Sequence, residues 1–252
     1  MTLSALILLL ILFFIMSAIG VVTGSNSLVT VPVMFQFGIE PKIAVATNMF
    51  GLAFMNIGAT LPFLKKDIID YKKLSPLIIL TLISSALGAM LVGFITDQSI
   101  KVIVIVGMIC VALFTLIKRD AGIAKITEIS TKATVLTYIF TFLLGIYGGL
   151  YSGGYTTLLT ALYVAFFGMT FTEAIAGTKL INIFSSGIAT IIFAWQGLID
   201  YKLGIILAVT MFIAAFIGAK TVTKLNDIRL KRIFLGVVFL LALKMLFDFI
   251  LK

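Results

Sequence analysis

The chain has 252 residues, of which 62% are hydrophobic and 12% charged, with a formal net charge of +9 and no histidine. A mean hydropathy of +1.24 is far above what a soluble core requires, so we exclude a separate soluble domain. The missing histidine excludes His-based metal sites, triads and proton relays. Because the lysines gather in a few loops, we assign the positive charge to membrane orientation and contact with the lipid bilayer, and expect no nucleic acid partner.

Apolar runs recur along the chain at or below the length that spans a bilayer, which predicts an all-α polytopic membrane protein of about 8–10 transmembrane helices. The predicted segments are Leu3–Val22, Ser27–Phe37, Ile43–Leu64, Leu74–Ile95, Ile100–Ile117, Ala133–Leu150, Tyr155–Phe167, Ala174–Trp195, Leu203–Ala219 and Ile233–Leu251. The second segment of each half is short or broken. The sequence leaves open whether Ser27–Phe37 and Tyr155–Phe167 cross the membrane fully or are re-entrant.

The two halves of the chain repeat each other at a shift of about 130 residues, which is longer than the periods of solenoid repeats. The run Ile69–Lys72 recurs as Ile199–Lys202, and Leu28–Thr30 resembles Leu158–Thr160. We therefore predict three parts: a first membrane repeat at 1–118, a basic cytoplasmic linker at 119–132 and a second membrane repeat at 133–252.

Three lysine-rich loops predict the orientation of the chain. Lys65–Lys73, Lys118–Lys132 and Lys220–Arg232 are basic and should be cytoplasmic. If every segment crosses, the duplicated Ile-Asp-Tyr-Lys loops fall on opposite sides, so the halves form an inverted repeat. If the short segments turn back without crossing, the parity breaks and the charge pattern fits worse. Inverted repeats with interrupted helices are typical of secondary transporters.

Glycines interrupt the chain at one position in each half. The stretch Gly145–Thr157 has five glycines and no charge, and Gly20–Ser27 echoes it. Each glycine inside a helix costs about 1 kcal/mol relative to alanine. Hydrocarbon tolerates broken backbone only where protein or a water-filled cavity satisfies the freed polar groups. We expect the two breaks to face each other and form one substrate site. The predicted break residues are Gly20, Gly24, Gly149, Gly153 and Gly154.

Small polar side chains follow each break and are the first set of candidate binding residues. A helix that begins after a break presents free N–H groups and a positive dipole end, which bind anions. The alternative is that small residues only let the helices pack closely. Two breaks at matching places of a repeat favour a site. The candidates are Ser25, Asn26, Ser27, Tyr155, Thr156 and Thr157.

A lysine inside an apolar segment marks the second set. Lys179 is an intramembrane ionisable residue, and Asn182, three residues later, shares its helix face. Together they could offer a cation and an amide donor to an anion. Alternatively, Lys179 reaches the near interface or pairs with Glu173. The full set is Thr178, Lys179 and Asn182 with their counterparts Thr47 and Asn48.

Motifs for chemistry are absent from the sequence. We find no phosphate-binding P-loop and no motif of an intramembrane protease or a metal site, so we predict no catalytic residue, cofactor or metal. The single cysteine, Cys110, cannot form an internal disulfide.

At its glycine breaks and two further motifs the chain resembles the TauE/SafE sulfite exporter family, also called TSUP. The resemblance rests on Gly20–Ser27, Ala44–Asn48, Gly148–Thr157 and Ala176–Asn182. It implies an inner-membrane carrier for sulfur-containing or organic anions such as sulfite, sulfoacetate or thiosulfate. The relatives that import thiosulfate look cysteine-dependent, and the lone Cys110 argues against that branch.

The sequence thus predicts a secondary transporter of the cytoplasmic membrane that moves a small anion by alternating access. The alternative is a membrane-embedded enzyme or accessory subunit acting on a lipid-soluble substrate, for which we find no acid/base or metal set. The specific anion, the direction of transport, a coupling ion (H⁺ or Na⁺) and the oligomeric state do not follow from the sequence.

Overall fold

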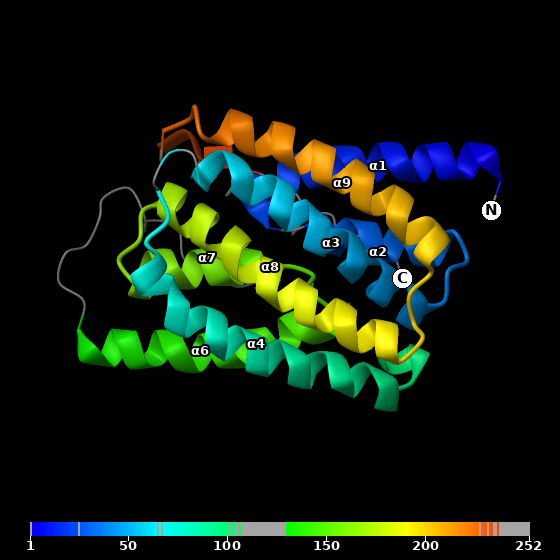
Figure 1. Cartoon of the computed structure of the whole chain (residues 1–252), viewed down its shortest axis with the longest axis horizontal. Helices are drawn as coiled ribbons and strands as arrows, with labels where there is room; N and C mark the ends of the chain where they lie inside the picture. Colours follow the sequence, from blue (N-terminus) through cyan, green and yellow to red (C-terminus); the bar gives the residue numbers. More distant parts are fainter. Residues whose placement is uncertain are drawn as a thin grey trace.

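The structure is a computed structural model that describes residues 2–24, 26–64, 66, 68–100, 102–103, 106, 130–226, 228–230, 232–233 and 236. These residues form α-helices joined by short connections (Figure 1). The helices that build the fold are α1 (Leu3–Thr23), α2 (Asn26–Gln36), α3 (Pro41–Leu64), α4 (Tyr71–Phe94), α6 (Thr131–Leu150), α7 (Tyr155–Phe166), α8 (Phe171–Trp195) and α9 (Tyr201–Val222).

Six of these helices, α1, α3, α4, α6, α8 and α9, are long and apolar enough to cross a membrane. The prediction of an all-α polytopic membrane protein is confirmed, and eight predicted segments match helices to within a few residues at each end. The predicted segments Ile100–Ile117 and Ile233–Leu251 lie mostly outside the described residues. At 1.5 Å per residue, the 11 residues of α2 and the 12 of α7 fall short of the ~30 Å hydrocarbon layer.

The duplicated Ile-Asp-Tyr-Lys motif begins a helix in each half. The side chain of Asp70 accepts a hydrogen bond from the backbone N–H of Lys73 at 3.1 Å and caps α4. Asp200 does the same for Leu203 at 3.1 Å and caps α9. An aspartate at the N-cap satisfies one of the free N–H groups of the first turn. The sequence repeat therefore corresponds to a repeated structural element.

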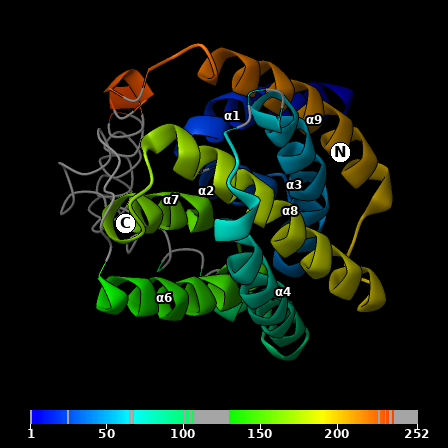
Figure 2. The same cartoon turned by 60° about the vertical axis from the view of Figure 1, so that its left-hand side comes forward.

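The helices form three layers, which Figures 1 and 2 show from two sides. Helices α1 and α9 pack together on one face, and α4 and α6 pack together on the other. The helices α3 and α8 cross between them and contact each other, with the short α2 and α7 beside them. These packing relations hold when each helix of the first half is exchanged for its counterpart in the second, whereas the smaller contact of α6 with α8 has no equivalent of similar extent between α1 and α3.

Counterpart helices run in opposite directions in Figure 1: α1 against α6, α3 against α8 and α4 against α9. As a result, the connection from α3 to α4, the start of α6 and the end of α9 gather at one end of the molecule. The three basic loops of the sequence adjoin these points. The described residues that flank the three loops therefore lie at one end of the fold.

Each glycine break reverses the chain instead of continuing it. A β-carbon placed at Gly20 in α1 would lie 3.1 Å from that of Asn26 in α2, and one at Gly148 in α6 would lie 2.7 Å from the ring of Tyr155 in α7. The pairs α1–α2 and α6–α7 are thus hairpins. Because both arms of a hairpin return together, turning back need not change the parity of the crossings, and the inverted repeat stays a prediction.

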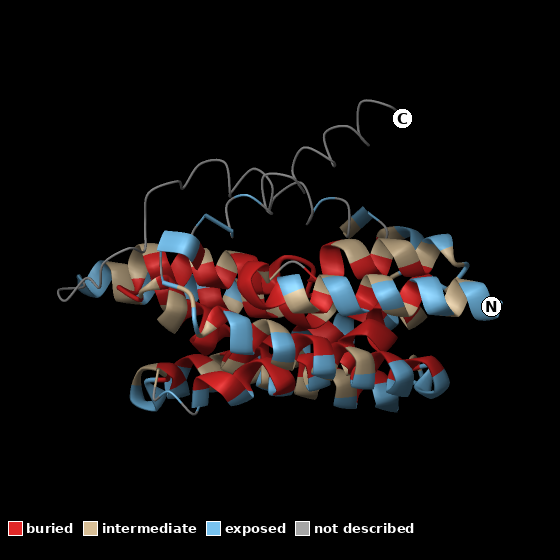
Figure 3. Cartoon of the chain, turned by 90° about the horizontal axis from the view of Figure 1, so that it is seen from above, coloured by how far each residue is buried: buried red, intermediate tan, exposed pale blue. Residues whose placement is uncertain are grey.

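The helices of the middle layer are more buried than those of the two outer layers. Most of α3 and α8 is buried, whereas α1, α4, α6 and α9 are buried on a minority of positions (Figure 3). Their outer faces carry large apolar side chains, such as Ile7 on α1, Leu143 on α6 and Ile205 on α9. Exposed apolar surface of this extent suits lipid and not water. The chain is a multi-pass membrane protein.

Glycines let the outer layers approach closely, as small residues do in membrane proteins. A β-carbon at Gly88 in α4 would overlap the carbonyl oxygen of Ile146 in α6. One at Gly218 in α9 would overlap the carbonyl oxygen of Ala18 in α1. Gly88 and Gly218 are counterparts at the shift of the sequence repeat, so both halves use the same contact.

Substituting Gly88 by alanine should destabilise the protein, because the added methyl group meets backbone that cannot rotate away. We expect a loss of about 1–3 kcal/mol, seen as a melting temperature lowered by several degrees in detergent. Gly187→Ala in α8 is the matched control, since nothing lies within 4 Å of a β-carbon there. Equal melting temperatures for the two variants would contradict the close contact of α4 with α6.

Candidate functional site

The first break is a left-handed glycine at the end of α1. Gly24 has φ +68°, and its N–H donates to the carbonyl oxygen of Gly20 at 2.9 Å. Glycine is the usual residue here because a β-carbon disfavours positive φ. The next described residue, Asn26, already begins α2. The reversal thus puts the end of one helix against the start of another.

The second break spans the residues between α6 and α7. Gly154, at φ +75°, is the N-cap of α7, and Ser152, at φ +66°, is the one non-glycine with positive φ in the described part of the chain. The hydroxyl of Tyr147 donates to the carbonyl oxygen of Gly153. Side chains of the same hairpin therefore satisfy backbone groups that the break leaves free.

Two of the predicted break residues are helical. Gly20 lies in the last turn of α1, and Gly149 lies in the last turn of α6. Their lack of a side chain serves packing instead: a β-carbon at Gly149 would overlap the carbonyl oxygen of Ser85. Gly24, Gly153 and Gly154 lie outside the helices.

The two breaks contact each other directly. The Thr156 hydroxyl donates to the carbonyl oxygen of Gly24 at 2.9 Å, and the Thr157 hydroxyl donates to that of Thr23 at 2.5 Å. The hydroxyl of Tyr151 donates to the carbonyl oxygen of Ser27 at 3.0 Å. Hydroxyls of Thr156 and Thr157 thus bond to the carbonyls at the end of α1, and that of Tyr151 bonds to the first turn of α2.

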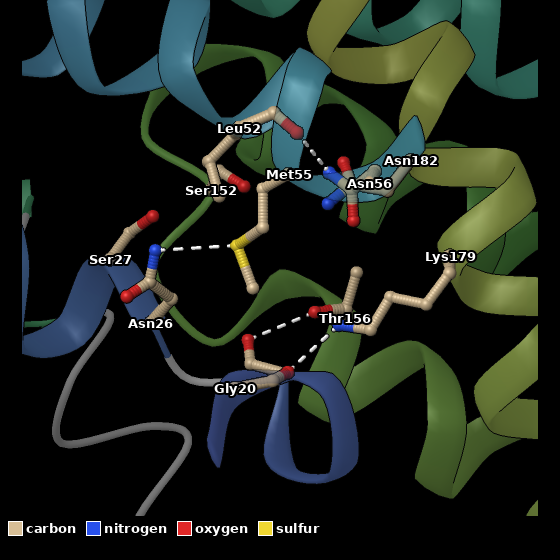
Figure 4. A pocket seen from close by; sticks show the side chains of 11 residues that line it. Gly20, Asn26, Ser27, Leu52, Met55, Asn56, Ser152, Thr156, Lys179 and Asn182 are labelled. Atoms are coloured by element: carbon tan, nitrogen blue, oxygen red, sulfur yellow. Dashed lines mark hydrogen bonds between the residues drawn. The ribbon is translucent and has the colours of Figure 1, made fainter. Parts of the chain in front are cut away.

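A small polar cavity of about 10 Å³ lies at this junction (Figure 4). Both hairpins and both central helices contribute to its wall. The lining residues are Gly20, Gly24, Asn26, Ser27, Leu52, Met55, Asn56, Ser152, Thr156, Lys179 and Asn182. No acidic residue is among them.

Lys179 is the one lysine or arginine among the described residues that line the cavity. It is 2% exposed, and its Nζ donates to the carbonyl oxygen of Gly20 at 2.8 Å. Glu173 instead closes a capping box with Thr170 at the start of α8. Lys179 therefore neither reaches the interface nor forms an ion pair with any described residue. A buried charge without a counter-ion costs on the order of several kcal/mol unless other groups stabilise it.

Three amide oxygens in the cavity wall have no hydrogen-bond partner. They are the Oδ1 atoms of Asn26, Asn56 and Asn182, whose side chains are 1–3% exposed. Buried amide oxygens are normally paired, because each unpaired one costs about 1–3 kcal/mol. All three residues line the same cavity, so it gathers unsatisfied acceptors as well as a cation.

The structure brings together about half of the predicted binding residues. Asn26, Ser27, Thr156, Lys179 and Asn182 line the cavity. The predicted residues that do not are Thr47, Asn48, Tyr155, Thr157 and Thr178, and Ser25 lies outside the described residues.

The residues that do not line the cavity support those that do. The amide of Asn48 donates to Ser27 Oγ and accepts from the Thr30 hydroxyl, both at 2.9 Å, which fixes the start of α2. In the second half, the hydroxyls of Thr178 and Thr160 lie 3.2 Å apart and link α8 to α7. These bonds position the hairpins against α3 and α8.

Sequence reasoning missed Asn56 and Ser152. The signal for Asn56 is that a polar amide within a membrane helix is itself an indication of function. Ser152 has no signal except its place beside the glycines of the second break. The apolar lining residues Leu52 and Met55 could not be told from core residues.

Replacing Gly24 by alanine should destabilise the junction of the breaks. A β-carbon there would lie 2.5 Å from Thr156 Oγ1 and 2.6 Å from the backbone nitrogen of Thr157, at positive φ. Gly38→Ala is the control, because Gly38 also has positive φ, at +79°, with nothing within 4 Å. The control measures the cost of positive φ alone. We therefore expect Gly24→Ala to lower the free energy of unfolding by about 1–3 kcal/mol more than Gly38→Ala does. Equal losses would mean that the breaks do not touch.

Comparison with known proteins agrees with this architecture. The family described as "Sulfite exporter TauE/SafE" matches residues 8–245. The probable membrane transporter protein ORF9 of Sinorhizobium sp is 25% identical over 239 residues, covering 93% of this chain and 90% of that protein. The probable membrane transporter protein YfcA of Escherichia coli K12 is 24% identical over 245 residues, covering 94% and 89%. No solved structure matches the chain. Since the match extends over nearly its whole length, the chain belongs to the Sulfite exporter TauE/SafE family.

Proposed function

We propose that this protein is a secondary transporter that moves a small anion across the plasma membrane by alternating access. Membership of the family supports membrane transport, and its description suggests sulfite or a related sulfur-containing or organic anion. The relatives are named as membrane transporters, which points away from an enzyme. The cavity at the junction of the two breaks is the proposed binding site.

The observation that carries the proposal is the buried ammonium of Lys179. It lies in a cavity whose described lining residues include no carboxylate. The carbonyl oxygen of Gly20 stabilises it in part, since it belongs to the negative end of the α1 dipole. That oxygen also accepts from the N–H of Gly24, so the lysine shares its partner. An anion in the cavity would supply the missing counter-charge.

Two helix starts add to the positive potential of the cavity. Asn26 and Ser27 belong to the first turn of α2, and Thr156 belongs to the first turn of α7. Free N–H groups and the positive dipole ends of helices favour anions. Ser27 Oγ accepts from Asn48, which leaves its own hydrogen available to a ligand. The site thus offers short donors around one cation.

Alternating access would follow from rocking of the predicted halves, 1–118 and 133–252, with 119–132 as their link. The cavity takes walls from both halves, so a relative movement opens it to either side in turn. The opposite directions of counterpart helices in Figure 1 support an inverted repeat. The bonds Lys179–Gly20 and Thr156–Gly24 join the halves and are the contacts such a movement would exchange.

A membrane enzyme would need an acid/base or metal set. The described residues contain no cluster of three or more His, Cys, Asp or Glu side chains that could hold a metal. No observation on the cavity favours this alternative. Saturable counterflow of a labelled anion in liposomes separates the two classes, since a carrier alone produces it.

Replacing Lys179 by methionine should weaken anion binding strongly, because it removes the charge that the anion would neutralise while keeping an apolar stem of similar length. We expect the half-saturating anion concentration for counterflow in liposomes to rise by at least about ten-fold, the equivalent of one charge-assisted hydrogen bond.

Lys73→Met is the matched control for that experiment. Lys73 also donates to a backbone carbonyl, that of Phe167 at 2.6 Å, but it does not line the cavity. Both variants are first checked for thermal stability in detergent. An unchanged half-saturating concentration in a folded Lys179→Met protein removes Lys179 from the site.

A further inference from the structure

The cavity wall offers a ligand two kinds of partner, and only one of them is cationic. Lys179 is the sole charged residue among the described lining residues. Beside it lie the unpartnered amide oxygens of Asn26, Asn56 and Asn182. A fully deprotonated anion can pair with the ammonium but has no hydrogen to give to these oxygens. It would leave them unpaired.

The hydrogen bond of Asn56 identifies which atom of its side-chain amide lacks a partner. Its nitrogen, Nδ2, donates to the carbonyl oxygen of Leu52 at 2.7 Å, one turn earlier in α3. A flipped amide would oppose two oxygens, so the nitrogen belongs on that carbonyl. The atom left without a partner is therefore Oδ1, an acceptor, on a side chain 1% exposed.

Asn182 places a second acceptor one turn of α8 from the ammonium. Its Oδ1 is also unpartnered, and the side chain is 3% exposed. Figure 4 shows both asparagines among the lining residues, with Lys179 reaching toward Gly20. The acceptors thus come from α3 of the first half and α8 of the second. A ligand with a donor would bridge the halves through them.

We propose that the preferred ligand is an organic monoanion that carries a hydroxyl group of its own, an inference that rests on the proposed transport function. The single ammonium pairs with the one anionic group, and the hydroxyl, which has one hydrogen, donates to the amide oxygen of Asn56 or to that of Asn182. A site with buried acceptors rejects an analogue that lacks the donor, because the acceptors then stay unpaired.

A bare metal cation is the competing occupant for amide oxygens. Here it would share a small cavity with the ammonium of Lys179, and no carboxylate of the described lining would offset the two positive charges. Repulsion between like charges in a poorly screened interior disfavours that arrangement. A donor on the anion itself satisfies one of these oxygens without adding positive charge.

Two matched ligand pairs test the inference on the full chain in detergent and in liposomes. Glycolate is compared with propionate, and 2-hydroxyethanesulfonate with propane-1-sulfonate, so that each pair exchanges a hydroxyl for a methyl group at equal size. Affinity is read from ligand-dependent thermal shifts and from competition with counterflow. We expect the hydroxylated member of at least one pair to bind about ten-fold more tightly.

Asn56→Leu and Asn182→Leu then assign the preference to the amides. At least one of the two should lower the affinity for the hydroxylated ligand without lowering that for the methyl analogue, so the ratio falls toward one. A purely structural role would lower both affinities together. The control is Thr190→Val, which removes another buried, unpartnered hydroxyl from α8 that does not line the cavity.

The outcomes separate this inference from the proposed function. Equal affinities within both pairs, or tighter binding of the methyl members, overturn the inference and leave an anion site in place. Equal affinities that appear only with Na⁺ present overturn it in favour of a cation on the amide oxygens. Binding of none of the four anions overturns the proposed organic-anion site and the inference with it.

Discussion

The structure depends on one constraint: backbone that leaves a helix inside the membrane must find partners within the protein. At the first break the carbonyl oxygens of Thr23 and Gly24 find them in the hydroxyls of Thr157 and Thr156, which belong to the other half of the chain. Neither hairpin could therefore be stable alone at this depth. The requirement that joins the hairpins also places two helix starts and a lysine around one small cavity.

The buried lysine follows from the same geometry. An ammonium at this depth needs an oxygen, and the last turn of α1 provides one at Gly20. The absence of a side chain at Gly20 matters because Asn26 of the returning arm fills the space where one would project. Chain reversal, close packing and charge stabilisation thus meet at a single residue. The cavity stays polar because the amide oxygens of Asn26, Asn56 and Asn182 have no hydrogen-bond partner within the protein.

Much of this architecture could be predicted from the sequence because apolar runs and glycine spacing are local properties. The eight segments, the meeting of the breaks and the candidacy of Lys179 as a cavity residue all follow from such patterns. The helical conformation of Gly20 and Gly149 could not be predicted. A glycine that ends a helix and a glycine that allows close helix packing look alike in a sequence. Asn56 was missed for a related reason: whether an amide is satisfied depends on groups that only the fold brings near it.

The hydrogen bonds between the two breaks are directional, and this has a consequence for energetics. Among the described residues, the side-chain donors at the junction, Tyr151, Thr156 and Thr157, all come from the second half, and the acceptors all come from the first. Exchanging the roles of the halves would not recreate these bonds, because Asn26 and Ser27 differ from the two threonines that match them. A carrier that rocks about this junction would have two end states of unequal free energy. Its empty form would rest facing one side of the membrane, and loading from the other side would first require thermal excitation out of that resting form.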